Sequence, residues 1–549
     1  MSLVGYKVLL SQIKLYDTKV LQEKLGLKEL KTLNDEQLCQ AYAKLGNSLP
    51  LALGSDFSFV LYNAEKETYF CARDPLGIKS LYFTKIEDSY RFSSTVDELL
   101  KIPNVLKNPN LNAMRTMLYQ RTVDYTETMY EGVYRLPPGH FMVIENGKER
   151  MERYWYPEKI KIDYAITENA AAKKLKVLFE KAVKNRISKL EETAFEVSGG
   201  LDSSSVVSIL SQNILPSSID SYSMDFKGLH CDEDEYIDSI LENYALHHQK
   251  IPCDHLDYHH RYPLKHLYKM SPSWPITLTF AMYIPLFEQM KRDGKKIVIS
   301  GQGGDHLFTG TSYVYYDLFR RFKFLALSKE FKTHKRPWNS IKVYIIKPIL
   351  GEKGTHFVRI LLGKKEISSS SLFEEKNKIK DLSDIAEVKN PAHKHDLDML
   401  TMSAHSTMMD GNFFHCAENY FGIEYRHPFF DKELVEFALS LPPEMKYKGG
   451  TIKWILRKAM DGILPDKIRD RKDKAEFSEL LIQQIDAIDL SKLLDDPYIA
   501  KLGLIEQSLI DKFRKEYEDK TVKYIVFLWT IINIEYWYRY NFEEESLPE

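Results

Sequence analysis

The sequence predicts a mixed α/β and α+β protein with two domains. The N-terminal domain, residues 1–160, is expected to be a β-rich sandwich, and the C-terminal domain, residues 165–549, a doubly wound parallel sheet. Three observations predict this architecture. The chain has 549 residues, too many for a single hydrophobic core. Short alternating apolar runs separated by turn signals fill the first domain. From residue 165 onward, strand patterns alternate with helical ones, which is typical of a parallel sheet covered on both faces.

Composition restricts the classes of protein that the chain can belong to. Hydrophobic residues make up 44% and charged residues 28%, as in soluble globular proteins. The formal net charge of −2 argues against a nucleic-acid partner held by bulk electrostatics. Five widely spaced cysteines fit neither a disulfide framework nor a zinc site, and residues 1–7 have no signal-peptide layout, so we expect a cytoplasmic protein. The apolar run 524–537 is too short to span a bilayer and predicts a buried helix.

The strands of the N-terminal domain are predicted from apolar alternation and from the turns between them. The expected strands are residues 57–62, 68–71, 81–83, 90–92 and 140–144. Turn signals such as Asp74-Pro75-Leu76-Gly77 and Pro137-Pro138-Gly139 separate them.

The elements of the C-terminal domain follow in strict alternation. A helix over 170–189 has apolar side chains on one face. Then come a strand at 194–197, a helix at 202–213, a strand at 219–226, a helix at 278–292 and a strand at 296–300. Residues 313–395 form a basic, irregular stretch that we interpret as an insertion or lid. In such sheets ligands bind at the carboxyl ends of the strands, so the loops after 197 and 300 should share one site.

The first of these loops, Ser198–Ser204, has the composition of a phosphate cradle. Its glycines let backbone N–H groups approach a ligand, its serines add hydroxyl donors, and the N-terminus of the next helix favours an anion. No lysine follows the glycines, so this is not the loop of kinases and GTPases. An acid in a phosphate cradle, here Asp202, is explained by a divalent cation that bridges it to the phosphates.

The second loop, Gly301–Asp305, resembles the first in its composition and in its position after a strand. Three glycines and an acid come directly after a buried strand. Asp305 is therefore expected to share a Mg²⁺ ion with Asp202, because carboxylates on neighbouring strand ends suit this metal.

These motifs carry a family resemblance. The pattern Ser-Gly-Gly-x-Asp-Ser at 198–203 resembles the pyrophosphate loop of ATP pyrophosphatases, which release AMP and pyrophosphate and include asparagine synthetase and β-lactam synthetase. Residues 72–82 and 153–155 resemble the glutaminase domain of asparagine synthetases, and residues 471–478 resemble their Arg-x-Lys-x-x-Phe-Ser segment. The resemblance implies a glutaminase-like sandwich of the N-terminal-nucleophile type, followed by a sheet of the ATP pyrophosphatase type.

The resemblance also implies roles for individual residues. Asp202 and Asp305 would hold Mg²⁺, Asp410 would orient or deprotonate the acceptor amine, and Lys474 would stabilise developing charge, with Lys472 as its rival. Gln302 stands where asparagine synthetases have a glutamate, and its amide cannot take a proton as a carboxylate does. The residues expected to bind ATP are Ser198, Gly199, Gly200, Asp202, Ser203, Ser204, Met224, Gly303 and Gly304.

The N-terminal domain departs from the family pattern. Position 2 is Ser2 where the family has its nucleophilic cysteine, and the nearest cysteine is Cys39. The family's early Asn-Gly-Glu segment is absent as well. We therefore predict a domain that lacks the nucleophile, has lost ammonia production and serves a structural or docking role.

The predicted reaction is ATP-dependent amide formation through a carboxyl adenylate. A chain that makes no ammonia should use an amine on its own substrate, which is the logic of lasso peptide cyclases, enzymes that this chain resembles. Such a cyclase joins the N-terminal amine of a linear core peptide to an Asp or Glu side chain, and works with a leader-peptide-binding protein and a leader peptidase. Two alternatives remain open: an amide synthetase acting on a small molecule with ammonia or an internal amine, and a non-catalytic scaffold.

Overall fold

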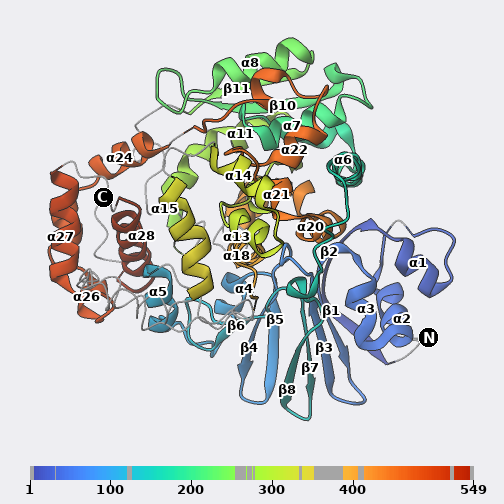
Figure 1. Cartoon of the computed structure of the whole chain (residues 1–549). Coiled ribbons are helices and arrows are strands. Elements are labelled where there is room, and N and C mark those ends of the chain that lie inside the picture. Colours follow the sequence, from blue (N-terminus) through green and yellow to red (C-terminus); the bar gives the residue numbers. More distant parts are fainter. Residues whose placement is uncertain are drawn as a thin grey trace.

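The computed structural model describes residues 5–30, 32–119, 126–253, 267–268, 275, 278–332, 337–350, 388–405, 413–475, 477–519 and 525–543. Figure 1 shows the N-terminal strands as a long group of arrows below a larger body of helices and short strands. The two predicted parts are therefore visible as separate regions that pack against each other.

Two antiparallel sheets form the N-terminal part. The larger sheet has the strand order β1-β2-β3-β7-β8 and the smaller one the order β5-β4-β6. The bounds are β1 (Tyr6–Asp17), β2 (Gly54–Asn63), β3 (Thr68–Arg73), β4 (Tyr82–Ile86), β5 (Ser89–Ser93), β6 (Val133–Arg135), β7 (His140–Glu145) and β8 (Lys148–Arg153). The five predicted strands are all present, within a few residues of their expected bounds, and β1, β6 and β8 are additional.

Apolar side chains pack both faces of the larger sheet. Val60, Cys71 and Met142 form one cluster with Phe83 and Tyr90 of the smaller sheet, which gives a sandwich. The other face meets three helices, α1 (Lys19–Leu25), α2 (Asp35–Leu45) and α3 (Leu49–Ala52).

A five-stranded parallel sheet is the centre of the C-terminal part. Its strand order is β11-β10-β9-β12-β13. The bounds are β9 (Thr193–Glu196), β10 (Asp220–Asp225), β11 (His247–Pro252), β12 (Ile297–Ile299) and β13 (Glu424–Arg426). All four pairings are parallel, and Ala194 of the middle strand lies opposite Val298 of β12. The predicted parallel sheet is confirmed.

Helices cover both faces of this sheet. Phe195 of β9 packs in one cluster with Phe179 of α6 (Glu168–Asn185) and Val207 of α7 (Leu201–Leu210). Its neighbour Ala194 packs in another cluster with Phe287 of α11 (Ile284–Arg292). Because adjacent residues of one strand point to opposite faces, the sheet is buried on both sides, as the doubly wound prediction requires.

The insertion differs from its prediction. Where residues 313–395 are described they are largely helical, in α13 (Val314–Arg320), α14 (Phe324–Lys332), α15 (Pro337–Ile341) and the start of α18 (Pro391–His405). The expectation of an irregular stretch is therefore wrong for this portion. The physical reason is a small apolar core of its own, formed by Val314, Tyr315, Leu318, Leu327 and Ile345.

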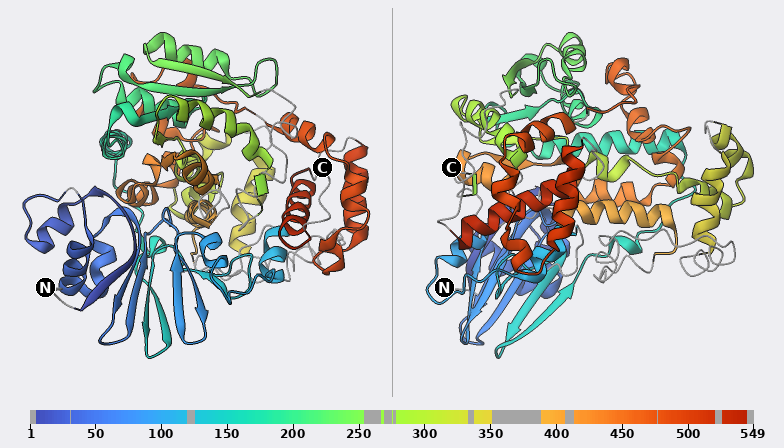
Figure 2. Two further views of the ribbon diagram at one scale, coloured as in Figure 1. Left: turned by 180° about the vertical axis from the view of Figure 1, so that it is seen from behind. Right: turned by 90° about the vertical axis from the view of Figure 1, so that its left-hand side faces the viewer.

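The last helix is buried, as its apolar sequence predicts. Helix α28 (Ile525–Phe542) packs Trp537 at 0% exposure and pairs its buried Glu535 with Arg539. It contacts α5 (Leu111–Leu118) of the N-terminal part, and Figure 2 shows the red C-terminal helices beside that segment. Among the described helices, none is both long enough and apolar enough to cross a bilayer.

Charged contacts join the two parts of the molecule. Glu424 of β13 lies 3.1 Å from Lys14 Nζ of β1 and 3.4 Å from Lys79 Nζ in the turn after β3. At the end of α6, the Arg186 guanidinium lies 4.3 Å from the ring centroid of Tyr16. The N-terminal part thus contacts the edge of the parallel sheet through charged groups as well as through apolar packing.

Candidate active site

The first loop turns sharply between β9 and α7. Gly199 has a φ of +67°, and a Cβ atom there would lie 2.8 Å from the Tyr236 Cβ, so this position requires glycine. The Ser198 N–H donates to Ser203 Oγ at 3.1 Å, and the two serine hydroxyls lie 2.9 Å apart. The loop is therefore folded onto the first turn of α7, and a helix N-terminus in this position suits an anion.

The second loop packs directly against the first. A Cβ atom on Gly301 would lie 2.4 Å from the Ser203 backbone nitrogen, and one on Gly304 would lie 2.3 Å from the Asp202 Cγ. Glycine at these positions is what lets α12 (Gly304–Phe308) approach α7 so closely. The approach places Asp305, in the first turn of α12, beside Asp202 in the first turn of α7.

Two lysines join the two acids. Lys453 Nζ lies 2.6 Å from Asp202 Oδ2 and 2.7 Å from Asp305 Oδ1, so it bridges the carboxylates. Lys474 Nζ lies 2.6 Å from Asp305 Oδ2. The loops therefore carry two carboxylates and two ammonium groups in direct contact, at the carboxyl ends of β9 and β12.

The electrostatic environments of the two acids differ. Burial alone would raise the pKa of Asp305, but the charges and hydrogen bonds of Lys453 and Lys474 outweigh it and hold this pKa far below its usual range. Burial raises the pKa of Asp202, and the nearby Asp305 charge raises it further, while Lys453 offsets part of the rise. Asp202 is consequently the acid whose charge needs a further cation.

The donor set fits Mg²⁺ and phosphate. Asp202 Oδ1 and Ser204 Oγ are buried and have no hydrogen-bond partner. Mg²⁺ is usually held by one or two carboxylates together with substrate phosphates, and Asp202 and Asp305 would supply the two carboxylates. Within the described ranges no cluster of three or more acidic, histidine or cysteine side chains forms a metal centre, so the remaining ligands would come from the phosphates and water.

Lys453 is a site residue that the sequence analysis missed. It precedes α22 (Trp454–Ala459), has a φ of +55° and is only 6% exposed. A non-glycine residue in the left-handed region is strained, which is common where a side chain must be aimed. The sequence feature that could have identified Lys453 is its position next to the apolar run Trp454-Ile455-Leu456. A lysine beside a buried run is itself buried and needs a partner of opposite charge.

The segment after α23 (Asp466–Arg469) separates the two rival lysines. Lys474 reaches Asp305, whereas the described structure shows Lys472 exposed, with its charge acting on Asp470 instead. The geometry places Lys474, and not Lys472, in the site.

Arg471 is a second residue that sequence reasoning missed. Its guanidinium donates to the Gly199 carbonyl at 3.3 Å, pairs with Glu233 and lies 3.8 Å from the ring centroid of Tyr236 on α8 (Asp234–Asn243). Arg471 therefore clamps the first loop to α8.

Gln302 is held through its backbone. Its N–H donates to Ser300 Oγ at 3.2 Å, and that hydroxyl lies 2.8 Å from His427 Nδ1. Burial lowers the pKa of His427 to about 3, so this imidazole is neutral. The contact anchors the second loop to the end of β13.

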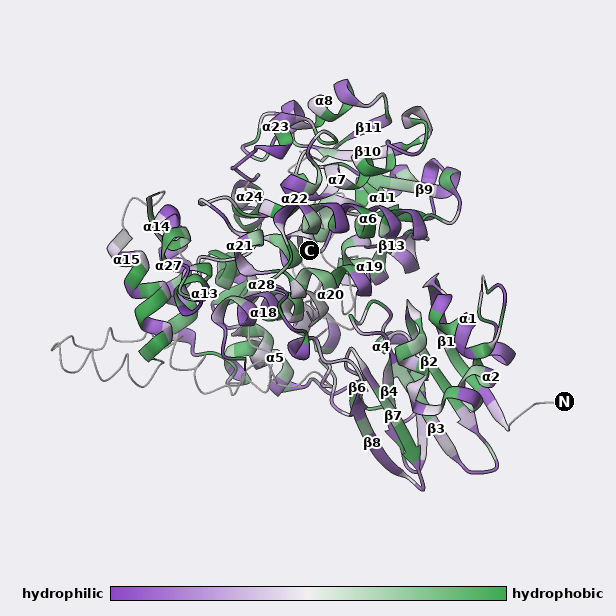
Figure 3. Ribbon diagram, turned by 45° about the vertical axis from the view of Figure 1, so that its right-hand side comes forward, coloured by the Kyte–Doolittle hydropathy of each residue, from purple (hydrophilic) through white to green (hydrophobic). Residues whose placement is uncertain are grey.

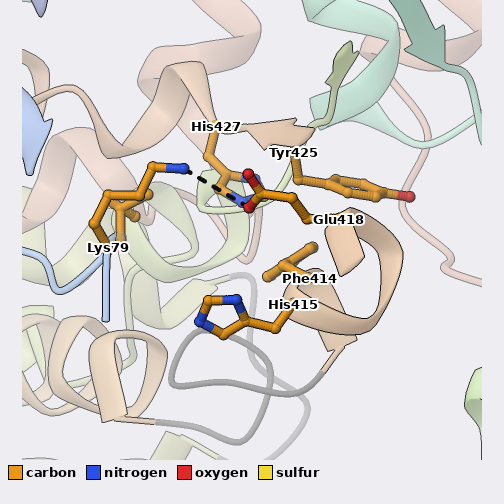
Figure 4. A pocket seen from close by; sticks show the side chains of 7 residues that line it. Lys79, Phe414, His415, Glu418, Tyr425 and His427 are labelled. Carbon is orange, nitrogen blue, oxygen red and sulfur yellow. Dashed lines mark ion pairs between the residues drawn. The ribbon is translucent and has the colours of Figure 1, made fainter. Parts of the chain in front are cut away.

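A small cavity lies behind this anchor, at the junction of the two parts. Its volume is about 30 Å³, and Figure 4 shows Lys79, Glu418, His415 and His427 around it. Lys79 and Glu418 form an ion pair at 3.9 Å across it. The cavity holds no more than a water molecule, so the nucleotide and acceptor have to bind elsewhere.

Two further residues that were predicted to bind ATP lie within the described residues. Gly303 has a φ of +102° and starts α12, and Met224 is the fifth residue of β10, at the carboxyl end of that strand. Asp410 lies outside the described residues, and its role stays a prediction. Ser2 lies outside them too.

The cysteine nearest to the N-terminus, Cys39, is not accessible as a nucleophile. Cys39 is buried, its Sγ donates to the Tyr6 carbonyl at 3.5 Å, and burial raises its pKa. All five cysteines are buried, and none of them forms a disulfide. A buried thiol of raised pKa is a poor nucleophile, because the thiolate is the reactive form.

The Arg-Asp motif of the N-terminal part builds a turn. Arg73 donates to the carbonyls of Gly77, Lys79 and Leu136, and Asp74 accepts backbone N–H bonds from three residues of the same turn.

Glu424, Arg426 and Asp431, in β13 and after it, belong to two separate ion pairs. Arg426 pairs with Glu424 at 3.1 Å. Asp431 instead pairs with Arg186 at 3.1 Å and caps α20 (Lys432–Ser440).

Comparisons with known proteins agree with both halves. A family model described as asparagine synthase matches residues 174–539, and one described as a glutamine amidotransferase domain matches residues 5–155. A putative glutamine-hydrolyzing asparagine synthetase 2 of Methanocaldococcus jannaschii is 25% identical over 54% of this chain and 57% of its own length. Glutamine-hydrolyzing asparagine synthetase 1 of Bacillus subtilis is 23% identical over 94% of this chain and 82% of its own. Amidase chyE of Penicillium rubens is 28% identical over 56% of this chain and 47% of its own. The chain thus spans little more than half the length of the first of these relatives.

Proposed function

The chain belongs to the asparagine synthase family, and from that premise we propose that it is an ATP-dependent amide ligase that releases AMP and pyrophosphate. In the finer form of the proposal it is a macrolactam synthetase of the lasso peptide cyclase type. It would adenylate an Asp or Glu side chain of a linear core peptide, and the N-terminal amine of the same peptide would then attack.

One observation carries the ligase proposal: the contact of Asp202 and Asp305 with Lys453 and Lys474 where the two glycine loops meet. Bound Mg²⁺ would neutralise the pyrophosphate charge. The α7 N-terminus and the Ser198 and Ser203 hydroxyls would bind the pyrophosphate oxygens.

The two lysines have different tasks in this scheme. Lys453 is buried and fixes the distance between the two acids. Lys474 is 76% exposed at the mouth of the site and can follow the charge that develops when the carboxylate attacks the α-phosphate and when the amine displaces AMP. Gln302 cannot accept the proton of the attacking amine, so that task falls to another carboxylate, and Asp410 remains the candidate.

Two features support a peptide substrate. Position 2 is Ser2 where the family has its nucleophilic cysteine, and Cys39 is buried, so we expect the amine to arrive on the substrate. The helical insertion exposes large apolar side chains beside basic ones: Phe322 at 78%, Leu325 at 86% and Trp338 at 82% exposure. Figure 3 shows α14 and α15 at the edge of the molecule, with hydrophobic segments in green. Such an exposed apolar surface suits the binding of a peptide or of a protein that delivers one. A leader-peptide-binding protein and a leader peptidase would be the partners of this kind.

A second candidate is an asparagine synthetase-like enzyme that amidates a small molecule with ammonia or an internal amine. The match of residues 5–155 to a glutamine amidotransferase domain favours it. It differs from the peptide proposal in its acceptor and not in its ATP chemistry.

The deciding experiment supplies purified protein with MgATP and a core peptide that bears an acidic residue near its N-terminus. We expect pyrophosphate release that depends on the peptide, and a product lighter than the peptide by one water. An N-acetylated copy of the peptide is the matched control: it should still support adenylation but lose no water. Equal turnover with aspartate and ammonium, with no response to the peptide, would reject the peptide proposal and leave the ligase.

A further inference from the structure

A second and larger cavity lies between the two parts of the molecule. Its volume is about 390 Å³. None of the side chains that hold Asp202 and Asp305 lines it. The walls come from the end of β1, the start of β2, the Asp74 turn, the end of α6 and the start of α20. A volume of this size accommodates a small organic molecule.

The charged side chains around this cavity are almost all paired with one another. Lys181 pairs with Asp17 at 2.6 Å and with Glu433 at 2.8 Å. Arg186 pairs with Asp431 through Nη1, although its Nε is buried without a partner. Asp74 accepts backbone N–H bonds from its own turn. Apart from that Arg186 nitrogen, these groups satisfy each other and do not require a ligand.

Asp56 is the exception. It is 7% exposed and lines the cavity, yet it forms no ion pair among the described residues, and its carboxylate has only a hydrogen bond from Tyr16. Ser55 Oγ, in the adjacent residue, is buried without a partner. A buried carboxylate without an ion pair is costly, and an unpartnered hydroxyl at the same wall adds a second group that a ligand could satisfy.

The walls near Asp56 are partly apolar. Val20, Leu51, Leu53 and Leu76 line the same cavity. A ligand that satisfies both features has a cationic head for the carboxylate and an aliphatic body for these side chains.

We propose that this cavity binds a small organic cation, an alkyl ammonium or guanidinium, whose charged group pairs with Asp56. The Tyr16 and Ser55 hydroxyl oxygens would accept its remaining N–H groups. The site lies apart from the ATP loops and does not depend on which amine the ligase uses. Because a ligand there touches β1, β2, α6 and α20 at once, it would hold the two parts of the molecule together.

The environment of Asp56 predicts how binding responds to pH. Burial raises the pKa of Asp56 to about 7, with Arg186 and Lys79 opposing the rise and Asp74 adding to it. Tyr16 faces it too. A primary alkyl amine stays charged up to a pH of about 10. Binding should therefore strengthen as the pH rises from 6 to 8, because Asp56 ionises in that interval.

The test uses the full chain and isothermal titration with n-pentylamine, n-pentylguanidine and the uncharged n-pentanol. We expect both cations to bind and the alcohol to bind about tenfold more weakly or not at all. Asp56→Asn should weaken n-pentylamine binding about tenfold or more, whereas Glu433→Gln, which also removes an acid from the cavity wall, should change it by less than about threefold.

Three outcomes would overturn the proposal: n-pentanol binding as tightly as the amine, Asp56→Asn binding the amine normally, or amine affinity that stays level or falls between pH 6 and pH 8. Asp56→Asn removes an unpaired buried charge, so it should unfold at a temperature no lower than the unsubstituted protein at pH 8. If it fails to fold, the comparison of amine with alcohol and the pH series on the unsubstituted protein still decide the question.

Discussion

At the scale of single residues, the candidate site is a pair of acids that share a buried lysine and meet an exposed one. The exposure of Lys474 means that its contact with Asp305 contributes little to folding, since exposed ion pairs are worth about 1 kcal/mol or less. Its position at the mouth of the site means that it can still matter for the reaction.

Replacing Lys474 with methionine should therefore lower the rate of pyrophosphate release by about 10²–10³-fold, the usual effect of removing one group that stabilises transition-state charge. The melting temperature should hardly change. Lys472→Met is the matched control, two residues away in the same segment, and should keep nearly full activity. Steady-state pyrophosphate release with both variants checks this, and equal losses in the two would contradict the assignment.

The motif residues of the two loops and Lys474 could be predicted as candidates because each motif is local, and the structure brings Asp305 into contact with Lys474. Their roles in the reaction stay predictions. It missed Lys453 and Arg471. Lys453 acts on Asp202 and Arg471 acts on Gly199, and both contacts join segments more than 200 residues apart. Local sequence patterns cannot predict contacts between residues this far apart in the chain.

At the scale of elements, the close approach of α12 to α7 depends on Gly304. Gly304→Ala places a methyl group where Asp202 stands, so we expect the acid to be displaced and adenylation to fall by at least about 10²-fold. Gly26→Ala is the control. Gly26 has a φ of +75° but open space around it, so its variant carries only backbone strain of about 1–2 kcal/mol. ATP–pyrophosphate exchange measures both, and a fully active Gly304→Ala would show that the two helices can separate without loss.

Strands with strong apolar alternation could be predicted, and weakly patterned ones could not. β11 has the sequence His-His-Gln-Lys-Ile-Pro and becomes a strand only because β10 offers it a parallel partner along six residues. β1 alternates half-buried and exposed positions only in its first half. The helices within residues 313–395 were missed for a related reason, since their buried apolar residues pack mainly against each other.

At the scale of the whole molecule, Glu424 ties the N-terminal part to the parallel sheet. Its side chain is 12% exposed and contacts Lys14, Lys79 and Arg426. Burial alone would raise the pKa of Glu424, but the charges of Lys79, Arg426 and Lys14 hold it at about 2. An unfolded glutamate titrates near pH 4.3. This depressed pKa stabilises the folded state above pH 4.3, and the stabilisation is lost as the pH falls toward 2.

Glu424→Gln should accordingly lower the free energy of unfolding by about 3 kcal/mol at pH 7. The difference from the unsubstituted protein should shrink by about half near pH 3. Glu418→Gln removes the more exposed acid beside Lys79 and should cost less than about 1 kcal/mol. Urea unfolding at pH 7, 4 and 3 measures all three proteins. A Glu424→Gln deficit that is the same at every pH would show that packing, and not charge, joins the two parts.

The order in which the site residues occur along the chain has a consequence for synthesis. Asp202 leaves the ribosome early, Asp305 follows, and Lys453 and Lys474 come much later, after the insertion. β9 pairs with β10 on one side, but its other side stays unpaired until β12 has been synthesised. A nascent or prematurely terminated chain can thus display the first glycine loop but cannot assemble the four charges, because domains acquire their contacts only as their parts emerge. If the proposed ligase activity is correct, incomplete chains should release no pyrophosphate from ATP.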